Sequence, residues 1–99
     1  GEAWLSLANA LVAHADGTLS PAALFAFRRA GAAAPNSPGP PFFLGLAMAQ
    51  SGRFAEARAQ WADLLARSPE DAPWRADLTD KLARLDALIA RQQAAGQGR

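Results

Sequence analysis

The sequence predicts an all-α protein, and its composition carries that prediction. Alanine and leucine, which form helices readily, occur 26 and 13 times among the 99 residues. The β-branched residues, which favour strands, number only four: Val12, Thr18, Thr79 and Ile89. Hydrophobic residues make up 51% of the chain, so it can build a core, and its length suits one domain or part of one.

Turn-forming residues divide the chain into five expected helices. The first covers residues 2–15 and ends where Gly17 can take the left-handed conformation. The second begins with Ser20 as N-cap and Pro21 in its first turn, and it ends before Pro35. The other three helices are expected at about 39–52, 54–67 and 72–91, the last with Asp71 as its cap.

A residue pattern occurs twice along these helices. The first copy consists of Trp4, Leu7, Ala8, Ala23 and Phe27. The second copy has Pro41, Leu44, Gly45, Ala57 and Trp61 at the matching positions. This is the pattern of tetratricopeptide (TPR) repeats, which are helical hairpins of about 34 residues. Small residues let the two helices of a hairpin approach each other. The large residues are expected to fill the space between hairpins: Trp4, Leu7, Phe27, Leu44 and Trp61.

The predicted architecture is therefore an α-solenoid fragment with a short tail. The TPR domain is assigned to residues 1–91 and the flexible tail to residues 92–99. Within the domain, repeat 1 covers about 2–35, repeat 2 about 39–69 and the capping helix about 72–91. Because arrays of this kind need about three repeats to bury a continuous core, the capping helix must cover the second hairpin.

Several functions are disfavoured by what the sequence contains. The net charge of +1 supplies no basic excess for nucleic acid, so no nucleic-acid partner is expected. The chain has no cysteine, and His14 is its only histidine, so no metal site and no cofactor are expected. No nucleophile turn of the G-x-S-x-G type is present, and the prediction is that the chain is not an enzyme. A start at Gly1 without methionine suggests an excised fragment.

The candidate site is the concave face of the solenoid. Phe42 lies two residues before Leu44, so it is expected to point away from the hairpin core and into a groove. The proposed peptide-binding residues are Leu5, Asn9, Phe42, Leu46, Gln50 and Asp80. An exposed apolar face with a polar rim is typical of a binding site. Two alternatives are that the tail or a missing upstream repeat covers this face, and that the outer face of repeat 1 mediates self-association of the fragment.

Two stretches resemble a specific family. The run FFLGLAMAQSG at residues 42–52 and the run DAPWR at residues 71–75 are similar to the periplasmic TPR domain of c-type cytochrome biogenesis proteins of the CcmI or CycH type. The resemblance covers roughly residues 3–89. It implies a periplasmic domain that is attached to the membrane only through an N-terminal anchor missing here.

The same resemblance implies partners and a role. Such a domain binds the C-terminal helix of apocytochrome c and passes the apocytochrome to the haem-ligation machinery, as a chaperone and adaptor rather than as the ligase. The alternative interpretation is a generic TPR scaffold for protein–protein interaction in another bacterial assembly complex.

Overall fold

The computed structural model describes residues 2–97 of the chain. Within that range it contains five α-helices and no strand, which confirms the predicted all-α class. The helices are α1 (Glu2–His14), α2 (Pro21–Ala33), α3 (Gly39–Gln50), α4 (Phe54–Arg67) and α5 (Arg75–Gln97). None of these helices is both long enough and apolar enough to cross a membrane.

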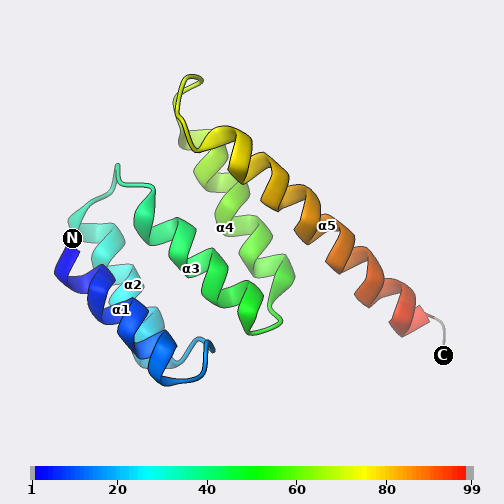
Figure 1. Ribbon diagram of the computed structural model, residues 1–99, viewed down its shortest axis with the longest axis horizontal. Coiled ribbons are helices and arrows are strands. Elements are labelled where there is room, and N and C mark those ends of the chain that lie inside the picture. The colour runs from blue at the N-terminus through cyan, green and yellow to red at the C-terminus, as the bar shows by residue number, and fades with distance from the viewer. Residues whose placement is uncertain (1, 98–99) are drawn as a thin grey trace.

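The helices form two antiparallel hairpins and a fifth helix, an arrangement compatible with a TPR-like solenoid fragment. The first hairpin is α1 with α2, the second is α3 with α4, and α5 packs against α4. Helix α3 also contacts both helices of the first hairpin. In Figure 1, α2 lies behind α1, and α4 lies behind and between α3 and α5. Helices α1, α3 and α5 therefore share one face of the molecule.

Left-handed residues end the first and third helices. Gly52 has a φ of 77°, and the N–H of the next residue, Arg53, donates to the carbonyl of Met48 over 2.8 Å. This closure is the hydrogen bond by which a left-handed glycine commonly ends a helix. At the end of α1, Gly17 has a φ of 86°, which confirms the left-handed conformation expected from the sequence, and Asp16 before it is left-handed as well, with a φ of 57°.

The start of α2 agrees with the expected cap. The Ser20 hydroxyl accepts the N–H of Ala23 over 3.1 Å, and Pro21 is the first helical residue. The end of α3 is tied to the first hairpin, because the Leu19 N–H donates to the Ser51 hydroxyl over 2.8 Å.

Helix α5 differs from its expected bounds at both ends. It begins at Arg75 rather than near residue 72, so Asp71 is not its N-cap; residues 70–74 form turns instead. At the other end the helix continues to Gln97, through most of the segment predicted to be a flexible tail. Residues 98–99 of that predicted tail lie outside the described residues. The continuation has a local cause, since Gln and Ala favour the helix and only one glycine, Gly96, interrupts them.

The core fills the space where the helices meet. Phe27, Trp61 and Leu78 are almost fully buried, with 2%, 3% and 1% of their surface exposed. Leu44 is buried as well, and Trp4 is partly buried. The expectation that Leu7 also fills an inter-hairpin space was wrong, because 46% of its surface is exposed.

Candidate functional site

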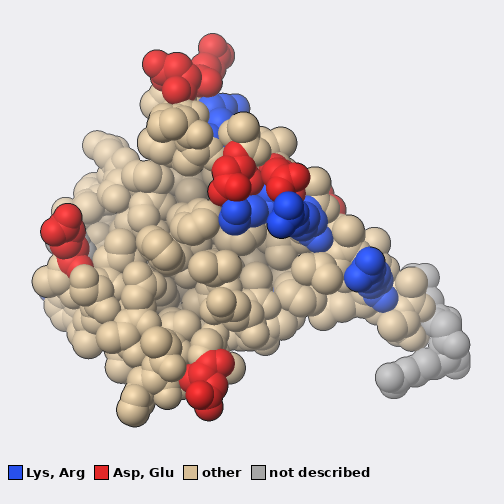
Figure 2. Space-filling view, in the orientation of Figure 1, with Lys and Arg blue, Asp and Glu red and all other residues tan. Residues whose placement is uncertain are grey.

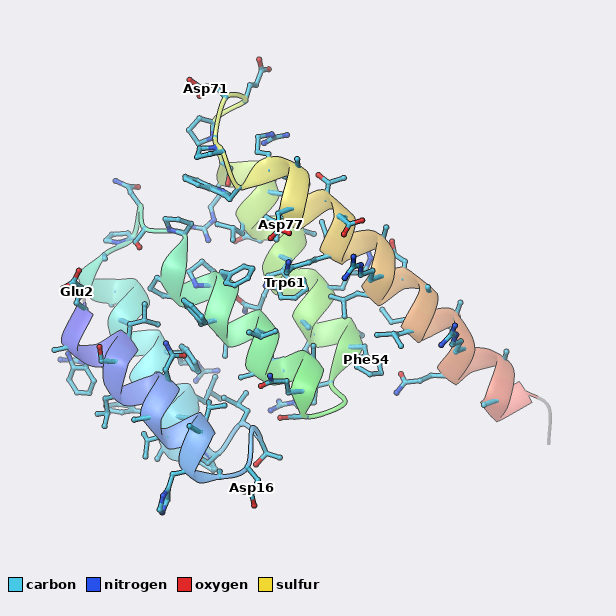
Figure 3. All side chains as sticks on the ribbon, in the orientation of Figure 1. Glu2, Asp16, Phe54, Trp61, Asp71 and Asp77 are labelled. Carbon is cyan, nitrogen blue, oxygen red and sulfur yellow. The ribbon has the colours of Figure 1, made fainter. Side chains whose placement is uncertain are left out.

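A groove runs between α3 and α5, and α4 supplies its floor. Its first cavity, of about 220 Å³, opens near the beginnings of α3 and α5. Residues of all three helices and of the segment before α5 line it: Pro38, Gly39, Phe42, Leu64, Trp74, Asp77 and Leu78. Figure 3 shows Asp77 on α5 beside this region and Trp61 on α4, between α3 and α5 in this view. Asp77 is the one charged residue in this otherwise apolar lining.

A second cavity, of about 180 Å³, lies further along the same two helices. Its lining is Leu46 of α3, Trp61 of α4, and Lys81, Arg84 and Leu85 of α5. The floor is again apolar, but the charged residues at the rim are cationic here. Both cavities therefore lie between α3 and α5. They differ in the charge that α5 places at the rim, which is negative at the first cavity and positive at the second.

The pair of Phe42 and Trp61 separates the cavities. Their rings are stacked, with centroids 5.8 Å apart and planes inclined by 17°. The Trp61 indole N–H donates to the Phe42 carbonyl over 3.0 Å. The expectation that Phe42 lies off the hairpin core was wrong, because its ring packs on a buried core residue. Phe42 therefore both lines the groove and supports the fold.

The charged rim belongs to α5. The Lys81 ammonium lies 2.8 Å from both carboxylate oxygens of Asp77 and 5.9 Å from the centroid of the Phe42 ring. Arg84 pairs with Asp80 over 3.0 Å. Figure 2 shows that the charges of this face gather along α5, whereas the surface over α1 and α3 is almost free of charge apart from acidic groups near its edges. The groove thus has one apolar wall and one wall with a charged rim.

Polar contacts hold the start of α5 against the end of α4. The Arg75 guanidinium donates to the carbonyls of Leu65, over 2.9 Å, and Ser68, over 3.1 Å. The Trp74 indole N–H donates to the Ser68 hydroxyl over 2.7 Å, and that hydroxyl donates to the Leu64 carbonyl over 2.6 Å. These bonds satisfy carbonyls at the C-terminus of α4 and determine where the α5 wall of the groove stands.

Further along, an ion pair joins the same two helices. The Arg58 side chain of α4 is hydrogen-bonded to the Asp86 carboxylate of α5. That hydrogen bond, and then the charge of Asp86, raise the pKa of the Arg58 guanidinium above its ordinary value. The pair adds a second attachment of α5 to α4.

Of the six residues proposed from the sequence, two line the cavities. Phe42 is in the first cavity and Leu46 in the second. Leu5 lies beside the groove, since a Cβ on Gly39 would stand 3.1 Å from Leu5 Cδ2. Asp80 is exposed and reaches the rim only through Arg84.

The remaining two proposed residues lie away from both cavities. Asn9 is half-buried on α1, and Gln50 is exposed at the end of α3, with its Oε1 near Gly17 of the α1–α2 turn. His14 is exposed in the last turn of α1. Within residues 2–97, no three His, Cys, Asp or Glu side chains lie close enough together to hold a metal ion.

From α5, the sequence placed only Asp80 in the proposed site, whereas the structure brings several α5 residues to the groove. The spacing of Trp74, Leu78 and Leu85 predicts a face that covers the second hairpin, and Leu78 and Leu85 are indeed buried there. The same residues also border the cavities, together with Asp77 and Lys81 from the charged face of that helix. The sequence did contain a signal for this wall: the pair Asp77 and Lys81, spaced four residues apart, directly flanks the apolar stripe of that helix.

Two packed hairpins with a fifth helix and an open apolar groove place this chain in the class of helical-hairpin solenoid fragments. Two curated proteins are similar to it in sequence. Over 79 residues it is 40% identical to the cytochrome c-type biogenesis protein CycH of Bradyrhizobium diazoefficiens, a match that covers 80% of this chain and 21% of that protein. Over 83 residues it is 40% identical to the CycH protein of Rhizobium meliloti, covering 84% and 22% of the two chains.

These matches confirm the resemblance found in the sequence: the chain is similar, over most of its length, to a segment of CycH-type cytochrome c biogenesis proteins. It spans about a fifth of the length of these relatives. No family model matches the chain. No solved structure matches it either.

Proposed function

We propose that this chain is a peptide-binding module of c-type cytochrome maturation, which holds apocytochrome c by its C-terminal helix as a chaperone and adaptor. The observation that carries the proposal is the groove between α3 and α5, with its apolar floor and charged rim. Amphipathic helices are commonly bound in grooves of this kind. A role in c-type cytochrome maturation is supported by the names of both relatives, which are cytochrome c biogenesis proteins.

In this proposal the chain binds its partner and catalyses nothing. Haem attachment is left to the haem-ligation machinery, which is the second proposed partner. The groove supports a holding role, because it presents packed aromatic and aliphatic side chains and surface ion pairs. We place the module in the periplasm, attached to the membrane through a segment outside this chain. Protease accessibility of the full-length protein in spheroplasts tests that placement.

Calorimetry with a synthetic peptide tests the binding. The peptide copies the C-terminal helix of an apocytochrome c and is titrated into this chain. We expect saturable binding. We also expect a full apocytochrome whose haem-attachment cysteines are replaced by alanine to bind about as well as the unaltered one, because this chain has no cysteine to pair with them.

A matched pair of variants shows whether the groove is the binding site. Leu46→Glu places a charge in the second cavity and is expected to weaken binding at least tenfold, whereas Arg28→Glu, exposed on α2, is expected to leave it unchanged. Circular dichroism of both variants checks the fold. If neither the peptide nor the apocytochrome binds this chain or the full-length protein, the cytochrome proposal is wrong and the generic scaffold takes its place.

A further inference from the structure

The two cavities of the groove are spaced like the side chains of a helix. Leu78 borders the first cavity and Leu85 the second, and these residues are seven apart on α5. At 1.5 Å per residue, they are about 10.5 Å apart along the helix axis. On the opposite wall, Gly39 and Leu46 are also seven residues apart on α3. The cavities are thus displaced by about two helical turns along both walls.

Each cavity has room for one large apolar side chain. Their volumes are about 220 Å³ and 180 Å³. An apolar cavity of about 150 Å³ can accommodate a benzene ring. Residues i and i+7 of a bound helix lie on one face about 10.5 Å apart, so both could enter the cavities at once. Between them, the bound helix would cross the ridge that Phe42 and Lys81 form.

Charge gives the groove a direction. The first cavity has the Asp77 carboxylate at its rim, and the second has the Lys81 and Arg84 cations. Arg84 can turn toward a ligand at small cost, because its side chain is 76% exposed and its pair with Asp80 is a surface pair. Lys81 is held more firmly, with 29% of its side chain exposed. A carboxylate on the ligand is therefore favoured beside the second cavity.

The dipole of a bound helix favours the same direction. Its N-terminus carries partial positive charge and its C-terminus partial negative charge. The N-terminus would lie toward Asp77, and the C-terminus toward Lys81 and Arg84. A bound helix in that direction runs parallel to α5.

From this geometry we infer that the groove binds an amphipathic helix with two large apolar residues at i and i+7 and a carboxylate beside the second, running parallel to α5. The inference rests on the proposed function and adds the spacing, charge and direction of the ligand. The i+7 residue enters the cavity lined by Leu46 and Leu85 and lies near the cationic rim.

Designed peptides test the spacing. The probe is an 18-residue, end-blocked helix of Ala, Gln and Lys with Leu at i and i+7 and Glu at i+8. A composition-matched peptide carries the second Leu at i+5, on another face of the helix. We expect the i+5 peptide to bind at least tenfold more weakly in calorimetry. Equal affinities would overturn the inference and leave the proposed function standing if the apocytochrome helix still binds.

Charge reversal tests the cationic rim. Replacing the Glu at i+8 by Lys is expected to weaken binding about fivefold or more. The Arg84→Glu variant of this chain is expected to bind the Lys peptide better than the Glu peptide, whereas the Arg28→Glu variant should still bind the Glu peptide better. If the Arg84→Glu variant also bound the Glu peptide better, the assignment of the cationic rim would be wrong. If the apocytochrome helix binds but neither designed peptide does, the inference alone is wrong. If the apocytochrome also fails to bind both this chain and the full-length protein, the proposed function fails with it.

A nitroxide label tests the direction. Placed at the N-terminus of the peptide, it is expected to broaden the amide signals around Asp77. Placed at the C-terminus, it is expected to broaden those around Arg84. The reverse pattern would contradict the parallel direction.

Discussion

Gly45 lies directly against the indole ring of Trp61. A Cβ built on Gly45 would stand 2.2 Å from Trp61 Nε1, closer than real Cβ contacts allow. Because α3 and α4 approach so closely at this point, the indole can fill the centre of the second hairpin and still donate to the Phe42 carbonyl. The glycine and the tryptophan therefore act as a pair: each determines how much room the other has.

Gly45→Ala should destabilise the fold. The added methyl group must displace the indole, and overpacking of this kind typically costs about 1–3 kcal/mol. Urea denaturation measures the loss. The matched control is Gly31→Ala on α2, where a Cβ meets nothing within 4 Å and the change should be neutral or stabilising by up to about 1 kcal/mol. Equal effects of the two substitutions would contradict the close approach.

Trp61→Ala should cost about 3–5 kcal/mol, as expected for a large buried aromatic residue. The loss combines a cavity under Gly45, the missing stack on Phe42 and the lost indole hydrogen bond to the Phe42 carbonyl. Since small domains have only about 5–15 kcal/mol of stability, partial unfolding at 37 °C is expected. Phe25→Ala is the comparison, because Phe25 is 58% exposed and its loss should be far smaller. A loss below 1 kcal/mol for Trp61→Ala in the urea titration would contradict its central position.

Arg75→Ala should loosen α5 from α4. It removes two hydrogen bonds from a charged donor to the carbonyls of Leu65 and Ser68, and we expect a loss of about 1–2 kcal/mol, with the contribution reduced by partial exposure. Hydrogen exchange should speed up at the beginning of α5 before it does so in α1 and α2. The control, Arg91→Ala, changes an exposed residue of the same helix and should shift exchange only locally. Uniform acceleration across all helices would contradict a local clamp.

Deleting residues 92–99 should leave the stability nearly unchanged. Residues 92–96 are all exposed, so the last turns of α5 add helix without adding core. We expect a change within about 0.5 kcal/mol in urea denaturation, as for surface changes in general, together with a small loss of ellipticity at 222 nm. A larger loss of stability would mean that these turns pack against the module.

The positions of most helices follow from helix propensity and from the residues that begin and end helices, without any reference to tertiary packing. Alanine-rich stretches separated by Ser20-Pro21, the prolines before Phe42, and Gly52 leave the backbone few alternatives to helices with these ends. The hairpin pattern was equally local, because Gly45 and Ala57 are small where the helices must approach. The ends of α5 were misjudged for a related reason: Asp71 has the right chemistry for a cap, but residues 70–74 turn before the helix begins.

What only the tertiary structure decided is where each apolar face points and what it meets. The sequence predicts that Phe42 points away from the core, yet its ring stacks on Trp61, 19 positions away. The sequence predicts that Leu7 is buried, yet it is exposed. Burial requires a neighbouring element to cover the residue, and helical periodicity does not show whether one does. The cavities likewise arise only where α3, α4 and α5 meet. Helical periodicity reports which residues share a face, and only the packing of the helices determines what covers that face.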